Sequence, residues 1–237
     1  MIGVILAAGD GTRLNKSTGQ NICKPLRKIK NTYLIEFALN NLIELNATAV
    51  YIVVGKQGDL IKNVIGEKYK GLSVYYVCQK EQKGLMNALI QALNVIDSTE
   101  TVILQLSDEI FVDLNVGLIK NVIETENNDF CCGVTTEENP EKIKGNFSVE
   151  VDDSSMLIKC VEKPEIVINN IKGTGFSIFN VETQKIIKEN ADKLVDLCDC
   201  FNYLIGLGYR GLTLNIAKKE FNINTASDFT EAEIYLK

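Results

Sequence analysis

An apolar segment that runs directly into a glycine-containing loop constrains the fold more than any other feature of the chain. Residues 2–7 read Ile-Gly-Val-Ile-Leu-Ala, and Gly9 and Gly11 follow shortly after. Continuous apolar character over this length is typical of a strand buried on both faces, as in a parallel sheet. Because glycine has no Cβ, a ligand can approach the loop closely and several N–H groups can converge on an anion. With the cations of Arg13 and Lys24 nearby in the sequence, the segment indicates phosphate binding.

Two common phosphate-binding loops do not fit this segment. The dinucleotide-binding fingerprint requires a third glycine where this chain has Leu14. The P-loop of nucleoside triphosphatases requires glycines where this chain has Asp10 and Asn15, although Lys16-Ser17 would supply its last two residues. The loop therefore belongs to a different class of phosphate-binding site.

A longer string around the loop points to one family. Residues 6–14 read Leu-Ala-Ala-Gly-Asp-Gly-Thr-Arg-Leu, Thr18 follows, and residues 24–26 read Lys-Pro-Leu. This string resembles the signature of the sugar-phosphate nucleotidyltransferases, which are also called NDP-sugar pyrophosphorylases. The resemblance implies that the loop binds a nucleoside triphosphate through these residues: Leu6, Ala7, Ala8, Gly9, Gly11 and Thr12.

Strand and helix patterns alternate in the first half of the chain. The expected strands are 50–54, 74–77 and 101–106, and the expected helices are 33–45, 60–65 and 84–96. This alternation predicts right-handed crossovers and a parallel sheet that helices cover on both faces. The resemblance implies an α/β fold of this kind, a Rossmann-like three-layer sandwich with a mostly parallel mixed sheet. Ligands bind at the carboxyl ends of such strands, so Gly9, Gln79 and Asp108 should share one face.

The second half has a different pattern. A helix is expected over 114–125, and short strands then follow at 130–135, 147–151 and 157–161, with a turn at 152–155. This pattern predicts a small antiparallel portion inserted beside the main sheet. Further strands are expected at 176–179, 211–217 and 220–224, and further helices at 183–189, 196–207 and 228–236. Asp59, Asp113 and Ser227 are the predicted N-caps of their helices. We expect a single domain, with a nucleotide-binding half (1–112) and an acceptor-binding half (113–237).

Composition excludes several functions. The chain has 237 residues, a net charge of −6 and an isoelectric point near 4.9, which argues against general affinity for nucleic acid or an anionic membrane. No stretch approaches ~18 consecutive apolar residues, so no membrane-spanning helix is expected. No signal peptide is expected, because no basic region precedes the first apolar run. The seven cysteines form no Cys-x-x-Cys pair and predict reduced thiols in the cytoplasm.

The absence of histidine limits the chemistry further. Serine–histidine and cysteine–histidine nucleophilic schemes are excluded, because both need an imidazole base. A zinc site of the usual spacing is not expected either.

The resemblance also implies the metal ligands and the base-recognition residues. Asp108 would bind Mg²⁺, as does the aspartate at the end of the corresponding strand in the family. A second ligand is expected just before the last helix, where Asn224 is the first choice and Asn222 the reserve. An amide oxygen is a suitable ligand for a hard cation but adds no charge. Gln79 and Gly84 resemble the base-recognition segment of uridylyl- and thymidylyltransferases, although a flipped glutamine amide would also serve cytosine.

Residues 162–164 read Glu-Lys-Pro and resemble the family's acceptor-binding motif. Lys163 would contact the phosphate of the sugar phosphate, and Glu162 would hold sugar hydroxyls. Gly145 and Gly175 match positions at which the backbone approaches the sugar. Arg13, Lys24, Asp108 and Lys163 are therefore the predicted catalytic residues.

These residues predict transfer of a nucleoside monophosphate from UTP or dTTP to a sugar 1-phosphate, with Mg²⁺ and with release of pyrophosphate. One alternative is a cytidylyltransferase of the same fold that acts on a choline or polyol phosphate. Another is a nucleotide-binding regulatory subunit without turnover, which Asn224 in place of an acidic ligand would support. The acceptor and the oligomeric state stay open.

Overall fold

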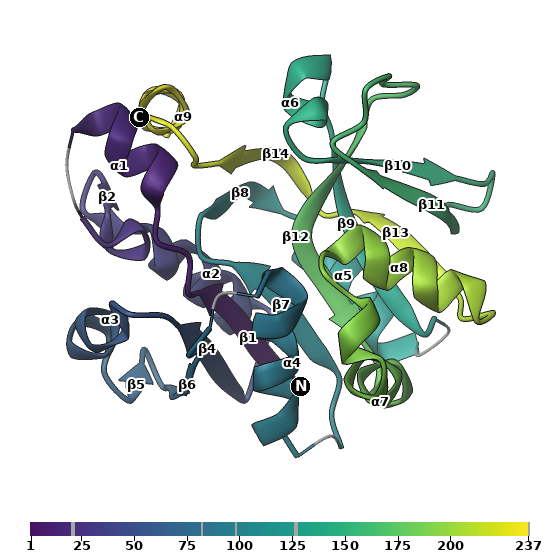
Figure 1. The fold of residues 1–237 in the computed structure, drawn as a ribbon, viewed down its shortest axis with the longest axis horizontal. Coiled ribbons are helices and arrows are strands. Elements are labelled where there is room, and N and C mark those ends of the chain that lie inside the picture. Colours follow the sequence, from purple (N-terminus) through teal and green to yellow (C-terminus); the bar gives the residue numbers. More distant parts are fainter. Residues whose placement is uncertain (20–21, 82, 98, 126–127, 237) are drawn as a thin grey trace.

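A ten-stranded mixed sheet forms the centre of the molecule in the computed structural model, which describes residues 1–19, 22–81, 83–97, 99–125 and 128–236 (Figure 1). Its strands lie in the order β11 (Leu157–Glu162), β10 (Phe147–Val151), β12 (Ile171–Phe179), β7 (Val102–Leu106), β1 (Ile2–Ala7), β4 (Ala49–Val54), β6 (Leu72–Cys78) and β5 (Lys68–Tyr69). Two more strands, β9 (Phe130–Thr136) and β13 (Gly211–Asn215), join the sheet through β12.

The centre of the sheet is parallel, as the alternating pattern predicts. β1 lies between β4 and β7, with Ile5 opposite Ile52 on one side and Gln105 on the other. β6 extends the parallel part beyond β4. Antiparallel pairing begins at β12, which pairs with β7 and β9. The β10–β11 hairpin joins the same sheet through Ser148 and Lys172, so the predicted antiparallel portion continues the main sheet.

Helices cover both faces of the sheet, which confirms the predicted three layers. On β1, Val4 and Leu6 pack into the core shared with α4, α7 and α8, whereas Ile5 and Ala7 face the core shared with α2, α3 and α5. The helices are α1 (Thr12–Thr18), α2 (Leu34–Glu44), α3 (Gly58–Ile65), α4 (Leu85–Val95), α5 (Val116–Thr125), α6 (Pro140–Lys144), α7 (Val181–Glu189), α8 (Leu197–Gly206) and α9 (Ala226–Tyr235), with 3₁₀ turns η1 (Lys24–Leu26) and η2 (Ala191–Lys193).

A second, two-stranded sheet positions the C-terminal segment. It pairs β8 (Glu109–Leu114) antiparallel with β14 (Ala217–Asn222), so that Asn222 lies opposite Glu109. A separate short hairpin pairs β2 (Lys28–Ile29) with β3 (Thr32–Tyr33). Because β8 immediately follows β7, the pairing carries residues near 224 to the end of the central sheet.

The predicted helix start at Asp113 is wrong. Residues 109–114 form β8, and Asp113 adopts a left-handed backbone conformation with φ of 53° within it. Asn115 provides the cap instead, since its Oδ1 accepts a hydrogen bond of 3.2 Å from the N–H of Leu118. The helix itself is confirmed, but α5 begins at Val116, two residues after the predicted start, because Leu114 belongs to β8.

Two other predicted caps are also wrong. Gln57 precedes α3, so Asp59 lies in the first turn, where a carboxylate interacts favourably with the helix dipole. Thr225 caps α9 through a capping box: the Asp228 carboxylate accepts from the Thr225 N–H at 2.7 Å, while the Thr225 hydroxyl accepts from the Asp228 N–H at 3.3 Å. Ser227 therefore lies inside the helix.

None of the helices in the described part of the chain combines the length and the apolar character that crossing a bilayer requires. All seven cysteines are free thiols, and all but Cys78 are buried.

Candidate active site

The glycine loop forms the floor of a cleft at the carboxyl ends of the parallel strands. Gly11 precedes α1 with φ of 62°, and a Cβ there would lie 2.7 Å from the Cβ of Lys24. Glycine at this position therefore allows Lys24 to pack against the loop. The cleft has a volume of about 450 Å³ and contains most of the predicted nucleotide-binding residues. Its lining includes Leu6, Ala8, Gly9, Gly11, Thr12, Arg13, Lys24, Gln79, Gly84, Asp108 and Asn224.

Ala7 is the exception among the predicted nucleotide-binding residues. It is the last residue of β1 and is 5% exposed, and its side chain packs into the core on the face covered by α2. Any role of Ala7 toward a ligand would therefore be limited to its backbone.

Four predicted residues meet at one point of the cleft. The Lys24 ammonium forms an ion pair with Asp108 and donates a hydrogen bond of 3.2 Å to Asn224 Oδ1. Arg13 donates a second hydrogen bond, of 2.9 Å, to the same oxygen. Two cations, a carboxylate and an amide oxygen thus converge here from four separate segments of the chain.

The backbone explains why these segments meet. At the end of β7, the N–H of Ser107 donates to the carbonyl of Leu6 at 3.1 Å, which holds Asp108 beside the glycine loop. The N–H of Ile223 then donates to the carbonyl of Asp108 at 2.9 Å, which continues the β8–β14 pairing. Asn224, the next residue, is therefore held against Asp108.

Asn224 and Asn222 have different environments. Asn224 presents its Oδ1 to Lys24 and Arg13, and its Nδ2 donates to Asn222 Oδ1 at 2.6 Å. Asn222 in turn donates to Asn146 Oδ1 at 3.0 Å. Asn222 therefore orients Asn224, and the oxygen of Asn224 is the one that faces the cations.

A second compartment of about 350 Å³ adjoins the first, and Arg13 and Asp108 line both. It contains all the predicted acceptor-binding residues: Gly145, Glu162, Lys163 and Gly175. The Lys163 ammonium lies 3.1 Å from Glu162 Oε1, and its side chain is 67% exposed. The N–H of Lys163 donates to the carbonyl of Asn146 at 2.7 Å, which fixes the backbone although the side chain is free to reorient.

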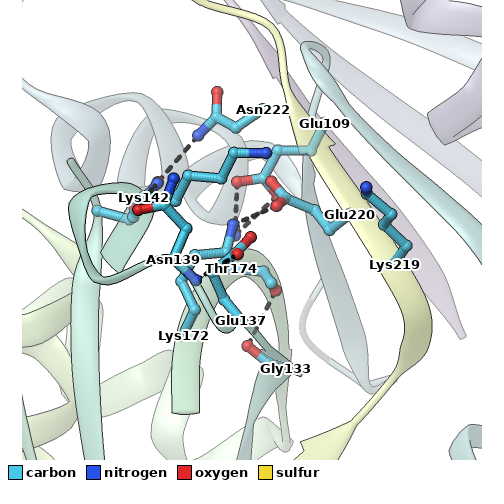
Figure 2. A network of polar contacts seen from close by, with 12 residues as sticks. Glu109, Gly133, Glu137, Asn139, Lys142, Lys172, Thr174, Lys219, Glu220 and Asn222 are labelled. Carbon is cyan, nitrogen blue, oxygen red and sulfur yellow. Dashed lines mark hydrogen bonds and ion pairs between the residues drawn. The ribbon is translucent and has the colours of Figure 1, made fainter. Parts of the chain in front are cut away.

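Sequence reasoning missed a network of buried charged residues, of which Glu109 lines this compartment (Figure 2). Lys172 on β12 forms an ion pair with Glu220 on β14, and the two side chains are 3% and 1% exposed. Glu109 accepts hydrogen bonds of 3.0 and 2.8 Å from the N–H of Gly175. For Glu109 the sequence does carry a signal, because this second acidic residue directly follows Asp108 at the end of a predicted strand.

Burial is the main electrostatic influence on this network. It raises the pKa of Glu109 well above the usual carboxyl range, and the nearby carboxylates of Glu220 and Asp108 raise it further. Lys172 and the N–H of Gly175 act in the opposite direction. Burial also raises the pKa of Glu220, while Lys172 lowers it.

The chain is similar to known nucleotidyltransferases over most of its length. The family model described as "Nucleotidyl transferase" matches residues 2–225. UTP–glucose-1-phosphate uridylyltransferase AglF of Haloferax volcanii is 31% identical over 181 residues, which cover 76% of this chain and 72% of AglF. The bifunctional protein GlmU of Methanococcus maripaludis is 29% identical over 224 residues, which cover 91% of this chain. The chain spans only about half of this relative, 50% of its length.

Solved structures with the same fold have lower sequence identity. UDP-glucose pyrophosphorylase, solved with UDP-glucose, has a TM-score of 0.82 at 18% identity, and the match covers 99% of this chain and 97% of that one. Inositol-1-phosphate CTP transferase from T. maritima has a TM-score of 0.79 at 18% identity, with coverage of 96% and 90%. These two likenesses establish the fold.

Proposed function

The chain belongs to the nucleotidyl transferase family, and we propose that it transfers the nucleoside monophosphate of UTP or dTTP to a hexose 1-phosphate, releasing pyrophosphate. The observation that carries this proposal is the convergence of Arg13, Lys24, Asp108 and Asn224 on one point, beside a compartment that contains Lys163. The similarity to AglF, a UTP–glucose-1-phosphate uridylyltransferase, supports this choice of substrates.

The reaction is a single in-line displacement. An oxygen of the acceptor phosphate forms a bond to the α-phosphorus, and the bond from that phosphorus to the bridging oxygen of the β-phosphate breaks. Pyrophosphate leaves with the electron pair. The attacking oxygen is already anionic, so no general base is needed, which agrees with the absence of histidine. The main obstacle is repulsion between two anionic substrates, which positioned cations reduce.

The cations have separate roles in this scheme. Arg13 and the N–H groups of the glycine loop bind the β- and γ-phosphates. Lys24 lines the nucleotide cleft, contacts Asp108 at the border of the two compartments, and holds the α-phosphate toward the acceptor. Lys163 binds the acceptor phosphate from the other side. Its exposed side chain has room to turn from Glu162 toward a bound phosphate.

Asp108 and Asn224 are suited to hold Mg²⁺. A side-chain oxygen of each already contacts the ammonium of Lys24, and hard oxygen ligands are those that Mg²⁺ prefers. Within the described residues no cluster of three or more acidic, cysteine or histidine side chains is arranged to hold a metal. The protein would therefore supply few ligands, as is usual for Mg²⁺ bound with a nucleotide. When bound, the metal supplies positive charge against the phosphates.

We assign acceptor hydroxyls to Glu162 and to the backbone at Gly145 and Gly175. The N–H of Gly175 is already used by Glu109, so a sugar would approach the other groups of this residue. The nucleotide would bind mainly to residues 1–112 and the acceptor mainly to residues 113–237, with Asn224 reaching across. The seven free thiols support a reducing compartment such as the cytoplasm.

Two alternative functions predict different results in the same assay. A cytidylyltransferase that acts on a polyol or choline phosphate would have the same fold, as does the inositol-1-phosphate CTP transferase. A regulatory subunit would bind the nucleotide without turnover.

A panel of nucleoside triphosphates against phosphate acceptors tests the proposal. Pyrophosphate release with Mg²⁺ should be fastest with UTP or dTTP and a hexose 1-phosphate. Release only with CTP and a polyol or choline phosphate would establish the first alternative. Nucleotide binding without release for any pair, at every Mg²⁺ concentration, would establish the second and overturn the proposed activity.

A further inference from the structure

The amide of Gln79 lies at the end of the nucleotide cleft, and its orientation is fixed by its neighbours. Gln79 follows β6, and its N–H donates to the carbonyl of Val54 at 2.8 Å. Its side chain lines the cleft although the residue is only 6% exposed. A glutamine amide has a donor end and an acceptor end, and the two ends select different bases. The end that faces the cleft therefore determines which base fits.

A backbone carbonyl identifies the donor end. Gln79 Nε2 lies 3.3 Å from the carbonyl oxygen of Gly84 and 3.0 Å from Asn87 Oδ1. A carbonyl oxygen can only accept, so the end of Gln79 beside Gly84 must be the NH₂ group. Rotation of the amide by half a turn would place two oxygens together and break both hydrogen bonds.

Asn87 is itself held in place along α4. Gln91, one helical turn further on, donates a hydrogen bond of 3.0 Å to the same Asn87 Oδ1. The oxygen of Asn87 thus accepts from two glutamines, which uses both of its lone pairs. The three amides form a chain from the half-buried face of α4 to the base end of the cleft.

Gln79 Oε1 and the N–H of Gly84 remain for the base, the first as an acceptor and the second as a donor. Among the hydrogen bonds between described residues, none uses Gln79 Oε1 as an acceptor or the Gly84 N–H as a donor. Uracil and thymine carry a donor at N3 and an acceptor at O4, which complements this pair. Cytosine carries an acceptor at N3 and a donor at N4, so both contacts are reversed.

We propose that Asn87 is a positioning residue that holds the Gln79 carbonyl oxygen toward the base and thereby favours pyrimidines with a hydrogen on N3 over cytosine. The inference rests on the proposed function, because it assumes that the cleft binds a nucleoside triphosphate. It goes further in assigning the choice of base to a residue of α4 that does not line the cleft.

Equilibrium binding of UTP and CTP to the full chain with Mg²⁺ tests this assignment. The unmodified protein should bind UTP about tenfold or more tightly than CTP, as expected for two hydrogen bonds that cytosine cannot make. Asn87→Ala should lower this ratio severalfold, because the Gln79 amide then loses its shorter hydrogen bond and keeps only the one of 3.3 Å to Gly84. Alanine favours a helix, so α4 should be retained. Asn87→Asp keeps the accepting oxygens and should keep the ratio.

Asn94→Ala is the matched control, since Asn94 is an exposed asparagine on the same helix. A loss of stability alone would weaken UTP and CTP binding together and leave the ratio unchanged. Equal binding of UTP and CTP by the unmodified protein would overturn the inference without the use of any variant. An unchanged ratio in folded Asn87→Ala would also overturn it.

Pyrophosphate release, measured in parallel, separates this inference from the proposed function. Absence of release together with an Asn87-dependent preference for UTP would reject the activity and support the inference. Release with UTP and a ratio that does not depend on Asn87 would support the activity and reject the inference.

Discussion

Two lysine–carboxylate pairs lie near the same cleft and differ in their access to solvent. The side chains of Lys24 and Asp108 are 11% and 22% exposed; both line the nucleotide cleft, and Asp108 also lines the acceptor compartment. Those of Lys172 and Glu220 are 3% and 1% exposed, and the two residues line a smaller pocket of about 220 Å³. The first pair therefore offers a ligand more accessible charged surface than the second. The difference agrees with the proposed role of the first pair in binding and chemistry, and it leads us to expect that the second pair holds β12 against β14.

Removal of one partner from the more buried pair, Lys172–Glu220, should have the largest effect on stability. Lys172→Met leaves the carboxylate of Glu220 buried without its cation, and such a change typically costs about 3–5 kcal/mol of unfolding free energy. Urea denaturation followed by circular dichroism measures this loss. The double variant Lys172→Met, Glu220→Leu removes both charges and should recover most of the stability. A loss below about 1 kcal/mol in the single variant would contradict a structural role.

Removal of one partner from the more exposed pair, Lys24–Asp108, should instead lower turnover and leave stability nearly unchanged. Lys24→Ala should lower kcat at least about a hundredfold, because a lost contact to the charge of the transition state costs about 3–4 kcal/mol. The fold should be retained, as judged by circular dichroism and the unfolding midpoint. Lys16→Ala, an exposed lysine of α1, is the control and should keep its turnover. Near-normal turnover of Lys24→Ala would remove this residue from the mechanism.

A variant of Lys163 tests whether the acceptor compartment, unlike the nucleotide cleft, needs a side chain to reorient before it binds its substrate. Its side chain is exposed and contacts Glu162, so it must reorient to bind a phosphate. Lys163→Ala should lower kcat/KM for the acceptor about tenfold, the effect of one charge-assisted hydrogen bond, and should change KM for the nucleoside triphosphate less. Initial rates with each substrate varied in turn measure the two effects. Lys159→Ala, on an exposed position of β11, provides the comparison. Equal changes in both KM values would argue against a role specific to the acceptor.

Glu109 should give the smallest effect, seen as a change in how stability depends on pH. Its raised pKa means that the folded chain retains a proton that the unfolded chain releases above its ordinary pKa of 4.5. Stability should therefore fall as the pH rises above about 4.5 and toward the folded-state pKa. Glu109→Gln should reduce this fall, although Glu220 still contributes in the same direction. Thermal unfolding midpoints over a pH series measure it, with the exposed Glu165→Gln as control. An unchanged slope would show that Glu109 does not titrate in this window.

The sequence predicts the parallel centre of the sheet well because its strands are continuous apolar runs followed by helices of regular period. It predicts Arg13, Lys24 and the glycine loop as neighbours because they lie close together along the chain. It also brings Asp108 to the same face, since the carboxyl ends of parallel strands share an edge. These inferences use local patterns and one rule of topology.

The parts that sequence reasoning missed depend on pairing between distant segments. Strand β8 has a mixed pattern, and its partner β14 begins more than a hundred residues later, so local patterns do not predict β8 and place the start of the following helix two residues too early. The Lys172–Glu220 pair joins two strands whose contact no local pattern reveals. The amide chain through Asn87 depends on one side-chain rotamer beside the carbonyl of Gly84. In each case the missing information is which residues meet in three dimensions.

Because β14 pairs with β8, the candidate site is completed late in the synthesis of the chain. The glycine loop, Lys24 and Asp108 all leave the ribosome early, and they can pack together while translation continues. Asn224 follows Asp108 by more than a hundred residues and reaches it only through this pairing. A nascent chain that ends before β14 therefore has the cations of the cleft but lacks the oxygen that Arg13 and Lys24 share. The complete set of side chains in the cleft therefore exists only after residue 224 has been translated.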